Sequence, residues 1–303
     1  MSSTLDGLVI AAYGRHYTVE LPDGTTRQCY PRGKKGAAAV GDRVRISLQG
    51  SGEGAIEAIA PRRNLLYRSD QQRSKQFAAN VDQMVLVVAT EPEFSEDLVG
   101  RSLAGAWAAG IASIIVLNKI DRTELLARAR ARLADVAALD IPIIELSAHD
   151  EQQARAVLGP LLAGRTSLLF GQSGMGKSTL LNALVPEADA ATREHSAALG
   201  TGRHTTTSTR MYDLPPAVAE DAAGRLIDSP GFQGFGLQHL SREDVERGFP
   251  EFAAHASHCR FYNCTHRHEP GCAVLSAIGH DIAPARHALY VRIVDENEAG
   301  ERY

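Results

Sequence analysis

A glycine-rich loop is the strongest chemical signal in the chain. Residues 171–178 read GQSGMGKS, which matches the pattern G-x-x-x-x-G-K-S. Glycines let backbone N–H groups approach phosphate oxygens closely, and the N-terminus of the following helix favours negative charge. We expect Lys177 to reach the β and γ phosphates of a nucleotide and assist catalysis, and Ser178 to bind Mg²⁺. The residues predicted to contact phosphate are Gly171, Gln172, Ser173, Gly174, Met175, Gly176, Lys177, Ser178 and Thr179.

A second motif points to the base. Asn118, Lys119 and Asp121 form the pattern N-K-x-D after an apolar run. A carboxylate at Asp121 would accept hydrogen bonds from N1–H and the 2-amino group of guanine, and adenine offers neither donor. Because an unpaired buried acceptor costs about 1–3 kcal/mol, guanine is favoured. Lys119 would cover the base with its stem, Asn118 would join neighbouring loops, and Ser147 and Ala148 fit a companion motif whose backbone N–H meets guanine O6.

These two motifs occur in an unusual order. N-K-x-D precedes the phosphate loop in this chain, whereas ordinary GTPases have the reverse order. Two switch-like motifs follow the phosphate loop. Asp228 and Gly231 form D-x-x-G, in which Asp228 would lie beside Mg²⁺ and the Gly231 N–H beside the γ phosphate. In the stretch GRHTTT at 202–207, one threonine would bind Mg²⁺; we favour Thr206, with its two threonine neighbours as alternatives.

The residue that would orient the attacking water is missing from its usual place. Phe232 follows Gly231 where many GTPases have a glutamine, and an aromatic ring cannot orient water. We therefore expect slow intrinsic hydrolysis that a partner or another residue accelerates. His204 is the candidate for a catalytic role, and a structural histidine is the alternative.

Three of the four cysteines cluster with histidines near the C-terminus. The pattern is C-x4-C-x-H-x5-C, and three thiolates with one imidazole suit a closed tetrahedral zinc site without a position for catalytic water. We expect one structural Zn²⁺; His258 and His268 are alternatives to the predicted histidine ligand. The predicted ligands are Cys259, Cys264, His266 and Cys272.

Composition indicates a globular protein. The 303 residues are 44% hydrophobic and 22% charged, with a net charge of -4, so two or three domains are expected and a uniformly basic nucleic-acid coat is not. No apolar stretch reaches the roughly 18 residues that a membrane helix needs, and the first residues lack the features of a signal peptide. We expect a cytoplasmic protein that does not enter membranes.

The first segment has short β-like runs separated by turn residues, a pattern typical of a five-stranded OB-type barrel. The apolar runs lie at residues 8–10, 17–21, 44–46 and 55–59. Basic side chains accompany them and form either a solvated surface or a nucleic-acid face. These are Arg27, Arg32, Lys34, Lys35, Arg43 and Arg45.

After residue 64, apolar strands alternate with helices, which predicts a doubly wound α/β domain with its ligand at the carboxyl ends of the strands. Expected strands lie at 84–89, 114–117, 143–146, 167–170 and 226–227, and expected helices at 97–109, 122–139, 151–162 and 177–184. Short helices at 242–249 and 285–297 then flank the cysteine cluster. This last segment has too few apolar residues for a core of its own, and bound metal would stabilise it.

Together these motifs resemble the RsgA (YjeQ-type) family of circularly permuted GTPases over essentially the whole chain. The resemblance rests on the inverted motifs, GRHTTT at 202–207, DSPGF at 228–232 and the cysteine-histidine tail. It implies an OB-fold barrel at 1–63, a permuted P-loop GTPase domain at 64–240 and a mostly helical zinc domain at 241–303. It also implies GTP hydrolysis stimulated by the small ribosomal subunit, a role in late maturation of that subunit, and rRNA binding through the barrel and zinc domains.

Two other functions remain open from the residues alone. A metabolic P-loop kinase would transfer phosphate to a metabolite, and a zinc-stabilised nucleic-acid-binding module would have a vestigial nucleotide site. The N-K-x-D motif disfavours the first, and the intact Lys177, Ser178 and Asp228 disfavour the second. We expect a monomer. Because Gly231 leads along the chain into the zinc segment, we also expect the nucleotide state to change the orientation or the subunit affinity of that segment.

Overall fold

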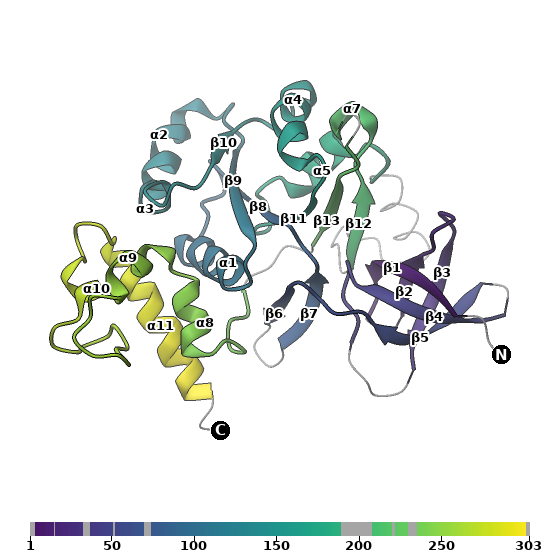
Figure 1. Cartoon of the computed structure of the whole chain (residues 1–303). Coiled ribbons are helices and arrows are strands. Elements are labelled where there is room, and N and C mark those ends of the chain that lie inside the picture. Colours follow the sequence, from purple (N-terminus) through teal and green to yellow (C-terminus); the bar gives the residue numbers. More distant parts are fainter. Residues whose placement is uncertain are drawn as a thin grey trace.

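The computed structural model describes residues 4–14, 16–32, 37–50, 52–69, 74–188, 208–219, 222–229 and 235–300. An α/β domain fills the upper part of Figure 1, with the N-terminal barrel below it on one side and the C-terminal helices below it on the other. Among the helices of these ranges, none is long and apolar enough to cross a membrane. The limits of the three domains, at 63/64 and 240/241, stay predictions.

The N-terminal strands form a closed barrel. The order is β1-β2-β3-β5-β4, β1 also pairs with β4, and β3 is parallel to β5, as the OB-type prediction requires. The third strand was not among the predicted apolar runs, because Cys29 is its one buried side chain. The strands are β1 (Thr4–Ala12), β2 (Tyr17–Glu20), β3 (Thr26–Pro31), β4 (Arg43–Gln49) and β5 (Glu53–Ile59).

The nucleotide domain is built on a mixed sheet of order β10-β9-β8-β11-β13-β12. All neighbours are parallel except β12, which runs antiparallel to β13. β8 is buried along its whole length, as its apolar run predicted, whereas the edge strand β10 is only half-buried. The strands are β8 (Gln83–Ala89), β9 (Ala112–Asn118), β10 (Ile143–Glu145), β11 (Thr166–Phe170), β12 (Thr209–Asp213) and β13 (Arg225–Asp228).

Helices cover both faces of this sheet, with α1 on one face and α4 and α5 on the other (Figure 1). Helices α4 and α5 have the predicted limits, but the helix predicted at 122–139 is divided at Leu133. Side-chain caps define two of the starts: Ser95 accepts from Leu98 N–H and Asp150 from Gln153 N–H. The helices are α1 (Glu96–Ala108), α2 (Thr123–Arg132), α3 (Ala134–Ala137), α4 (Glu151–Leu162), α5 (Lys177–Leu184) and α7 (Pro216–Ala219).

Two features join the barrel to the nucleotide domain, and neither was predicted. A hairpin of β6 (Leu65–Ser69) and β7 (Ser74–Ala79) follows the barrel, and Ala79 N–H donates to Val40 O at 2.8 Å. In addition, β12 pairs with β1, with Ala11 opposite Arg210 and Ala12 opposite Thr209. The sheet therefore continues from the nucleotide domain into the barrel.

The C-terminal helices pack onto α1 and share its core. Phe249, Phe252 and Tyr290 contact one another with ring centroids 5.1–5.4 Å apart, and they lie in the same buried cluster as Leu103 of α1. The segment therefore has no separate core and shares that of the nucleotide domain, which agrees with the prediction that it has too few apolar residues for a core of its own. Its elements are α8 (Arg242–Arg247), the 3-10 helix η1 (Pro250–Phe252), α9 (Ala253–Ala256), α10 (Ala273–Ser276) and α11 (Pro284–Gly300).

Candidate nucleotide and metal sites

The glycine-rich loop lies between β11 and α5, as expected for a phosphate-binding loop. Gly171, Gly174 and Gly176 have φ values of 148°, 83° and 89°, a region that favours glycine. Space requires glycine as well, because a Cβ at Gly171 would lie 2.3 Å from Val87 O and one at Gly176 would lie 2.2 Å from Asn118 Nδ2. Glycine is therefore required at these positions for the loop to adopt this conformation before α5, in which backbone N–H groups can bind an anion.

Asn118 connects the base-recognition motif to the phosphate loop. Its Nδ2 donates to Met175 O at 2.9 Å, and its Oδ1 accepts from the backbone N–H groups of Lys119 and Ala148 at 2.8 and 2.9 Å. The side chain is 1% exposed, so these bonds are shielded from water. Asn118 thus ties three loops together, although the motifs are reversed in the chain.

Asp121 stands at an open cavity of about 780 Å³. Ser147 Oγ donates to Asp121 Oδ1 at 2.7 Å, and this hydrogen bond lowers the pKa of the Asp121 carboxyl. The charged carboxylate can accept hydrogen bonds from donors in the cavity. His149 also lines the cavity and was not predicted; its place directly after Ser147 and Ala148 was the only signal for it.

The side chain of Lys119 is bound both to the phosphate loop and to the loop after β8. Its ammonium group donates to Gly174 O and to Glu91 O, each at 2.8 Å. Its backbone has a φ of 60°, and Thr90 Oγ1 donates to its carbonyl at 2.9 Å. The loop after β8, which contains Thr90 and Glu91, is a part of the site that sequence reasoning missed, since these residues belong to no motif.

Lys177 and Asp228 form a buried pair of opposite charges below the phosphate loop. Each is 8% exposed, and Lys177 Nζ donates to Gln172 O at 2.7 Å. Burial raises the pKa of Asp228 to about 6, against the opposing effect of Lys177, and burial lowers the pKa of Lys177. Burial disfavours the charged form of each group more than their mutual attraction favours it, so both would gain from contacts with a phosphate and a cation.

Gln172 connects the phosphate loop to α1. Its Oε1 accepts from Ser95 N–H at 2.6 Å, and Ser95 caps α1.

Of the other predicted nucleotide residues, Ser178 is exposed at the start of α5, and Thr179 is half-buried beside it. The predicted residues His204, Thr206 and Gly231, with Thr205, Thr207 and Phe232, lie outside the described residues.

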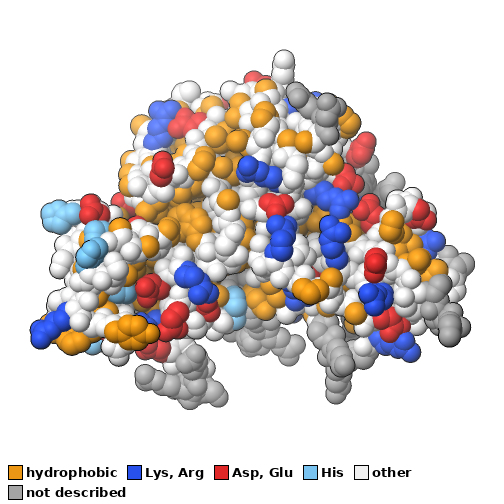
Figure 2. Space-filling model, in the orientation of Figure 1, with side chains coloured by type: hydrophobic (Ala, Val, Ile, Leu, Met, Phe, Trp, Pro, Cys, Tyr) orange, Lys and Arg blue, Asp and Glu red, His pale blue; other side chains and the backbone are white. Residues whose placement is uncertain are grey.

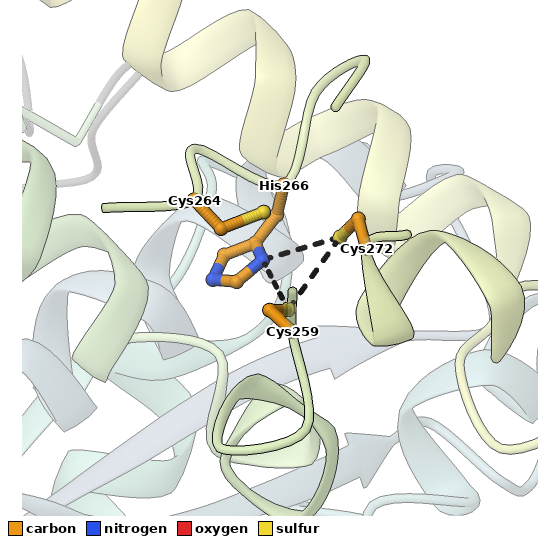
Figure 3. A group of neighbouring side chains, drawn as sticks. All are labelled: Cys259, Cys264, His266 and Cys272. Atoms are coloured by element: carbon orange, nitrogen blue, oxygen red, sulfur yellow. Dashed lines mark hydrogen bonds between the residues drawn. The ribbon is translucent and has the colours of Figure 1, made fainter. Parts of the chain in front are cut away.

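The four predicted metal ligands converge in the C-terminal region (Figure 3). Their ligand atoms all lie within 4.8 Å of one another. The Sγ atoms of Cys259 and Cys272 are 3.8 Å apart, and His266 Nδ1 lies 3.6 and 3.4 Å from them. Tetrahedral bonds of about 2.3 Å to sulfur would separate two thiolates by about 3.8 Å, so the group fits a tetrahedral ion. His258 and His268, the alternatives to His266, are exposed outside this group.

Comparisons with known proteins agree with this geometry. A family model described as RsgA GTPase matches residues 59–238. Proteins named "Small ribosomal subunit biogenesis GTPase RsgA" are similar along the chain: that of Bordetella pertussis (strain Tohama I) is 66% identical, covering 100% of this chain and 99% of the relative, and that of Burkholderia pseudomallei (strain K96243) is 57% identical, covering 96% and 91%.

Two solved structures are also similar. YjeQ from Thermotoga maritima has a TM-score of 0.69 and 29% identity, covering 98% of this chain and 99% of its own. YloQ, described as a circularly permuted GTPase, has a TM-score of 0.67 and 26% identity, covering 98% and 96%. The inverted motif order and the three-part fold are therefore those of known proteins.

Proposed function

Because the chain belongs to the RsgA GTPase family, and is thus a GTPase, we propose that it acts in the biogenesis of the small ribosomal subunit. The name of its relatives supports this role. In this proposal the subunit stimulates GTP hydrolysis, and the protein works as a cytoplasmic monomer late in subunit maturation. The observation that supports the site best is that Asn118 and Lys119 bond directly to the phosphate loop despite the inverted order.

For the base, Asp121 would accept from N1–H and the 2-amino group of guanine. Ser147 supports this role, because its hydrogen bond orients the carboxylate and keeps it charged. Ala148 N–H would lie near guanine O6, but in the described structure it donates to Asn118, so O6 would have to share that donor. The stem of Lys119, fixed at both Gly174 and Glu91, would cover one face of the base.

For the phosphates, the backbone of residues 171–179 would surround the β phosphate, and Lys177 would exchange its bond to Gln172 O for phosphate oxygens. Ser178, Asp228 and Thr206 would bind Mg²⁺. Bound Mg²⁺ would supply charge neutralisation at the phosphates. The Gly231 N–H would then hold the γ phosphate, and hydrolysis would release the segments of Thr206 and Gly231.

Hydrolysis in the free protein would be slow. Phe232 cannot orient water, so His204 or a group from the subunit would complete the site. A partner that supplies a missing group accelerates GTP hydrolysis by about 10³-fold or more in other GTPases.

The metal site would hold one structural Zn²⁺. Three thiolates and one imidazole, with sulfur and nitrogen separations that fit a tetrahedron, support this ion. The four ligands leave no position for substrate, so the ion would stabilise the fold of the segment that binds rRNA.

The barrel and the zinc segment would bind rRNA. On β4, Arg43 and Arg45 are exposed, and Arg45 has a loose ion pair with Asp6 at 3.7 Å. Figure 2 shows basic and acidic side chains interspersed on one face, with histidines gathered at the end that carries the C-terminal helices. Tyr262, between two metal ligands, is fully exposed. Such groups suit phosphate contacts and stacking on unpaired bases.

The decisive test is release of phosphate from GTP with and without purified small subunits. We expect stimulation of about 10³-fold for the unmodified chain, and none for Lys177→Ala. ATP should not compete with GTP. Equal rates with and without subunits would refute the proposed partner, and transfer of phosphate to a metabolite would refute the proposed reaction.

A further inference from the structure

The ligand His266 sits in an unfavourable backbone conformation. Its φ is 57°, which lies in the left-handed region that residues with a side chain rarely adopt. It is 3% exposed, and its neighbours in the loop are not part of a helix or strand. Surrounding contacts must therefore hold this turn in place before the imidazole can meet the three thiolates.

Glu269 supplies most of those contacts. Its Oε1 accepts from Thr265 N–H at 2.7 Å and from the Thr265 hydroxyl, and its Oε2 accepts from the N–H groups of Arg267 and His268 at 3.2 Å each. One carboxylate thus binds the backbone on both sides of His266. Both of its oxygens are used by donors, so the role requires two acceptors.

Glu246 of α8 faces the ring itself. Its Oε1 lies 3.5 Å from His266 Nε2, whereas Nδ1 of the same ring lies toward the sulfurs of Cys259 and Cys272 (Figure 3). Metal-bound histidines usually donate the N–H of their second nitrogen to a carboxylate or carbonyl, which fixes the ring and its tautomer. The Glu246 carboxylate therefore lies where it can accept a hydrogen bond from the Nε2–H group of His266.

Helix α11 holds the carbonyls of the same turn. His287 Nε2 donates to His266 O at 2.7 Å, and Tyr290 Oη donates to Thr265 O at 3.1 Å. The turn is therefore bound through its amides by Glu269, through its carbonyls by α11 and through its ring by α8. Both helices pack against α1 of the nucleotide domain.

We propose that Glu269 and Glu246 are positioning residues of the metal site: Glu269 fixes the turn that carries His266, and Glu246 fixes its ring. This goes beyond the proposed function, but it rests on the metal ion proposed there. It also means that α8, the first helix after the second switch motif, contributes to metal affinity.

The test measures metal affinity of the full-length chain by competition with a chromogenic chelator. We expect Glu269→Gln to weaken binding by about 10- to 100-fold, because glutamine offers one acceptor and turns an NH₂ group against N–H donors. Glu246→Ala should weaken binding by about tenfold. Glu246→Gln should stay close to the unmodified protein, since its amide oxygen can still accept from Nε2–H.

Glu243→Gln is the matched control on α8, because Glu243 is exposed and pairs with Arg242 at 3.0 Å. Arg242 also donates to Cys264 O at 3.0 Å, and the amide oxygen of glutamine can still accept from Arg242, so this contact is kept. The metal affinity of this variant should not change. Reloading with Co²⁺ gives a second readout: the visible bands of Glu269→Gln should shift if water replaces His266, and those of Glu243→Gln should not.

Unchanged affinity and an unchanged cobalt spectrum in Glu269→Gln would overturn the proposal, as would equal losses in Glu246→Gln and Glu246→Ala. If Glu269→Gln does not fold, Glu269→Asp decides, because it keeps two acceptors on a shorter stem; affinity equal to that of the unmodified chain would contradict the proposal and a several-fold loss would support it. An unmodified chain that binds no ion would instead refute the metal site itself.

Discussion

The barrel and the C-terminal helices join the nucleotide domain by different kinds of contact. The barrel has a buried cluster of its own, which includes Val19, Val44 and Ile46, and a smaller number of its side chains, such as Val40, lie in the buried cluster of the nucleotide domain. It meets the nucleotide domain through short backbone pairings, such as the two residue pairs of β1 with β12, and through the ion pair of Arg225 with Glu20 at 3.1 Å. Because few side chains of the barrel enter that core, these pairings can separate at a smaller cost in exposed apolar surface.

The C-terminal helices have no such independence. Phe249, Tyr290 and Ile293 belong to the buried cluster that also contains Leu103 of α1. The backbone at the end of α8 lies directly against that of α1, because a Cβ on Gly248 would lie only 2.5 Å from Ala104 O. Close-packed cores move as units, so a separate reorientation of the metal segment would be costly.

This difference changes the expected route of the nucleotide signal. The predicted switch residue Thr206 precedes β12, which pairs with the barrel, and the predicted Gly231 precedes Phe235, which packs on Gly105 of α1. We expect the first switch to alter the β1–β12 joint, and the second to move α1 and the C-terminal helices together. The predicted change in the orientation or the subunit affinity of the metal segment stays a prediction; the shared core disfavours a change of orientation that is independent of α1.

The largest effect should come from removal of the metal ion by a chelator. A closed tetrahedral zinc site contributes about 10 kcal/mol to the folding of small zinc domains. Because the core is shared, we expect hydrogen exchange to accelerate in α8, α11 and α1, while β1–β5 keep their protection. Loss of protection in the barrel, or unchanged exchange in α1, would show that the barrel is coupled to the metal site as closely as the C-terminal helices, or that these helices are not coupled to α1.

An intermediate effect should follow Gly248→Ala. The added methyl group must displace backbone of α1, since the nearest atoms are Ala104 O, C and Cα at 2.5–3.0 Å. We expect a loss of about 1–3 kcal/mol in the free energy of unfolding, measured with urea. Gly300→Ala is the control, because no described atom other than its chain neighbours and the backbone of its own helix lies within 4 Å of its added Cβ. Equal stability of the two variants would contradict the tight α8–α1 contact.

The smallest effect should come from the ion pair at the barrel joint. Arg225 also pairs with Asp213 at 2.8 Å, and its side chain is 35% exposed. A double-mutant cycle of Glu20→Ala and Arg225→Ala should give a coupling energy below about 1 kcal/mol. A coupling of several kcal/mol would mean that the barrel is fixed as firmly as the C-terminal helices.

The sequence predicted the parts of this molecule that depend on short segments. The phosphate loop, N-K-x-D and the metal ligands are local patterns, and α4 has an apolar period and a capping Asp150 that define its limits. It did not predict β3, β12 or the β6–β7 hairpin, because these strands depend on distant partners more than on their own apolar pattern. Similarly, Glu246 belongs to no motif, and only the folded chain brings it to His266.

Hydrogen exchange of the free chain with GDP and with a non-hydrolysable GTP analogue tests the central claim most directly. We expect the nucleotide to change the protection of peptides that contain Ala11, Ala12, Thr209 and Arg210, while α8 and α11 keep equal protection in both states. Opening of α8 and α11 with an unchanged β1–β12 pairing would contradict the account, because the C-terminal helices would then open locally instead of moving as a unit with α1.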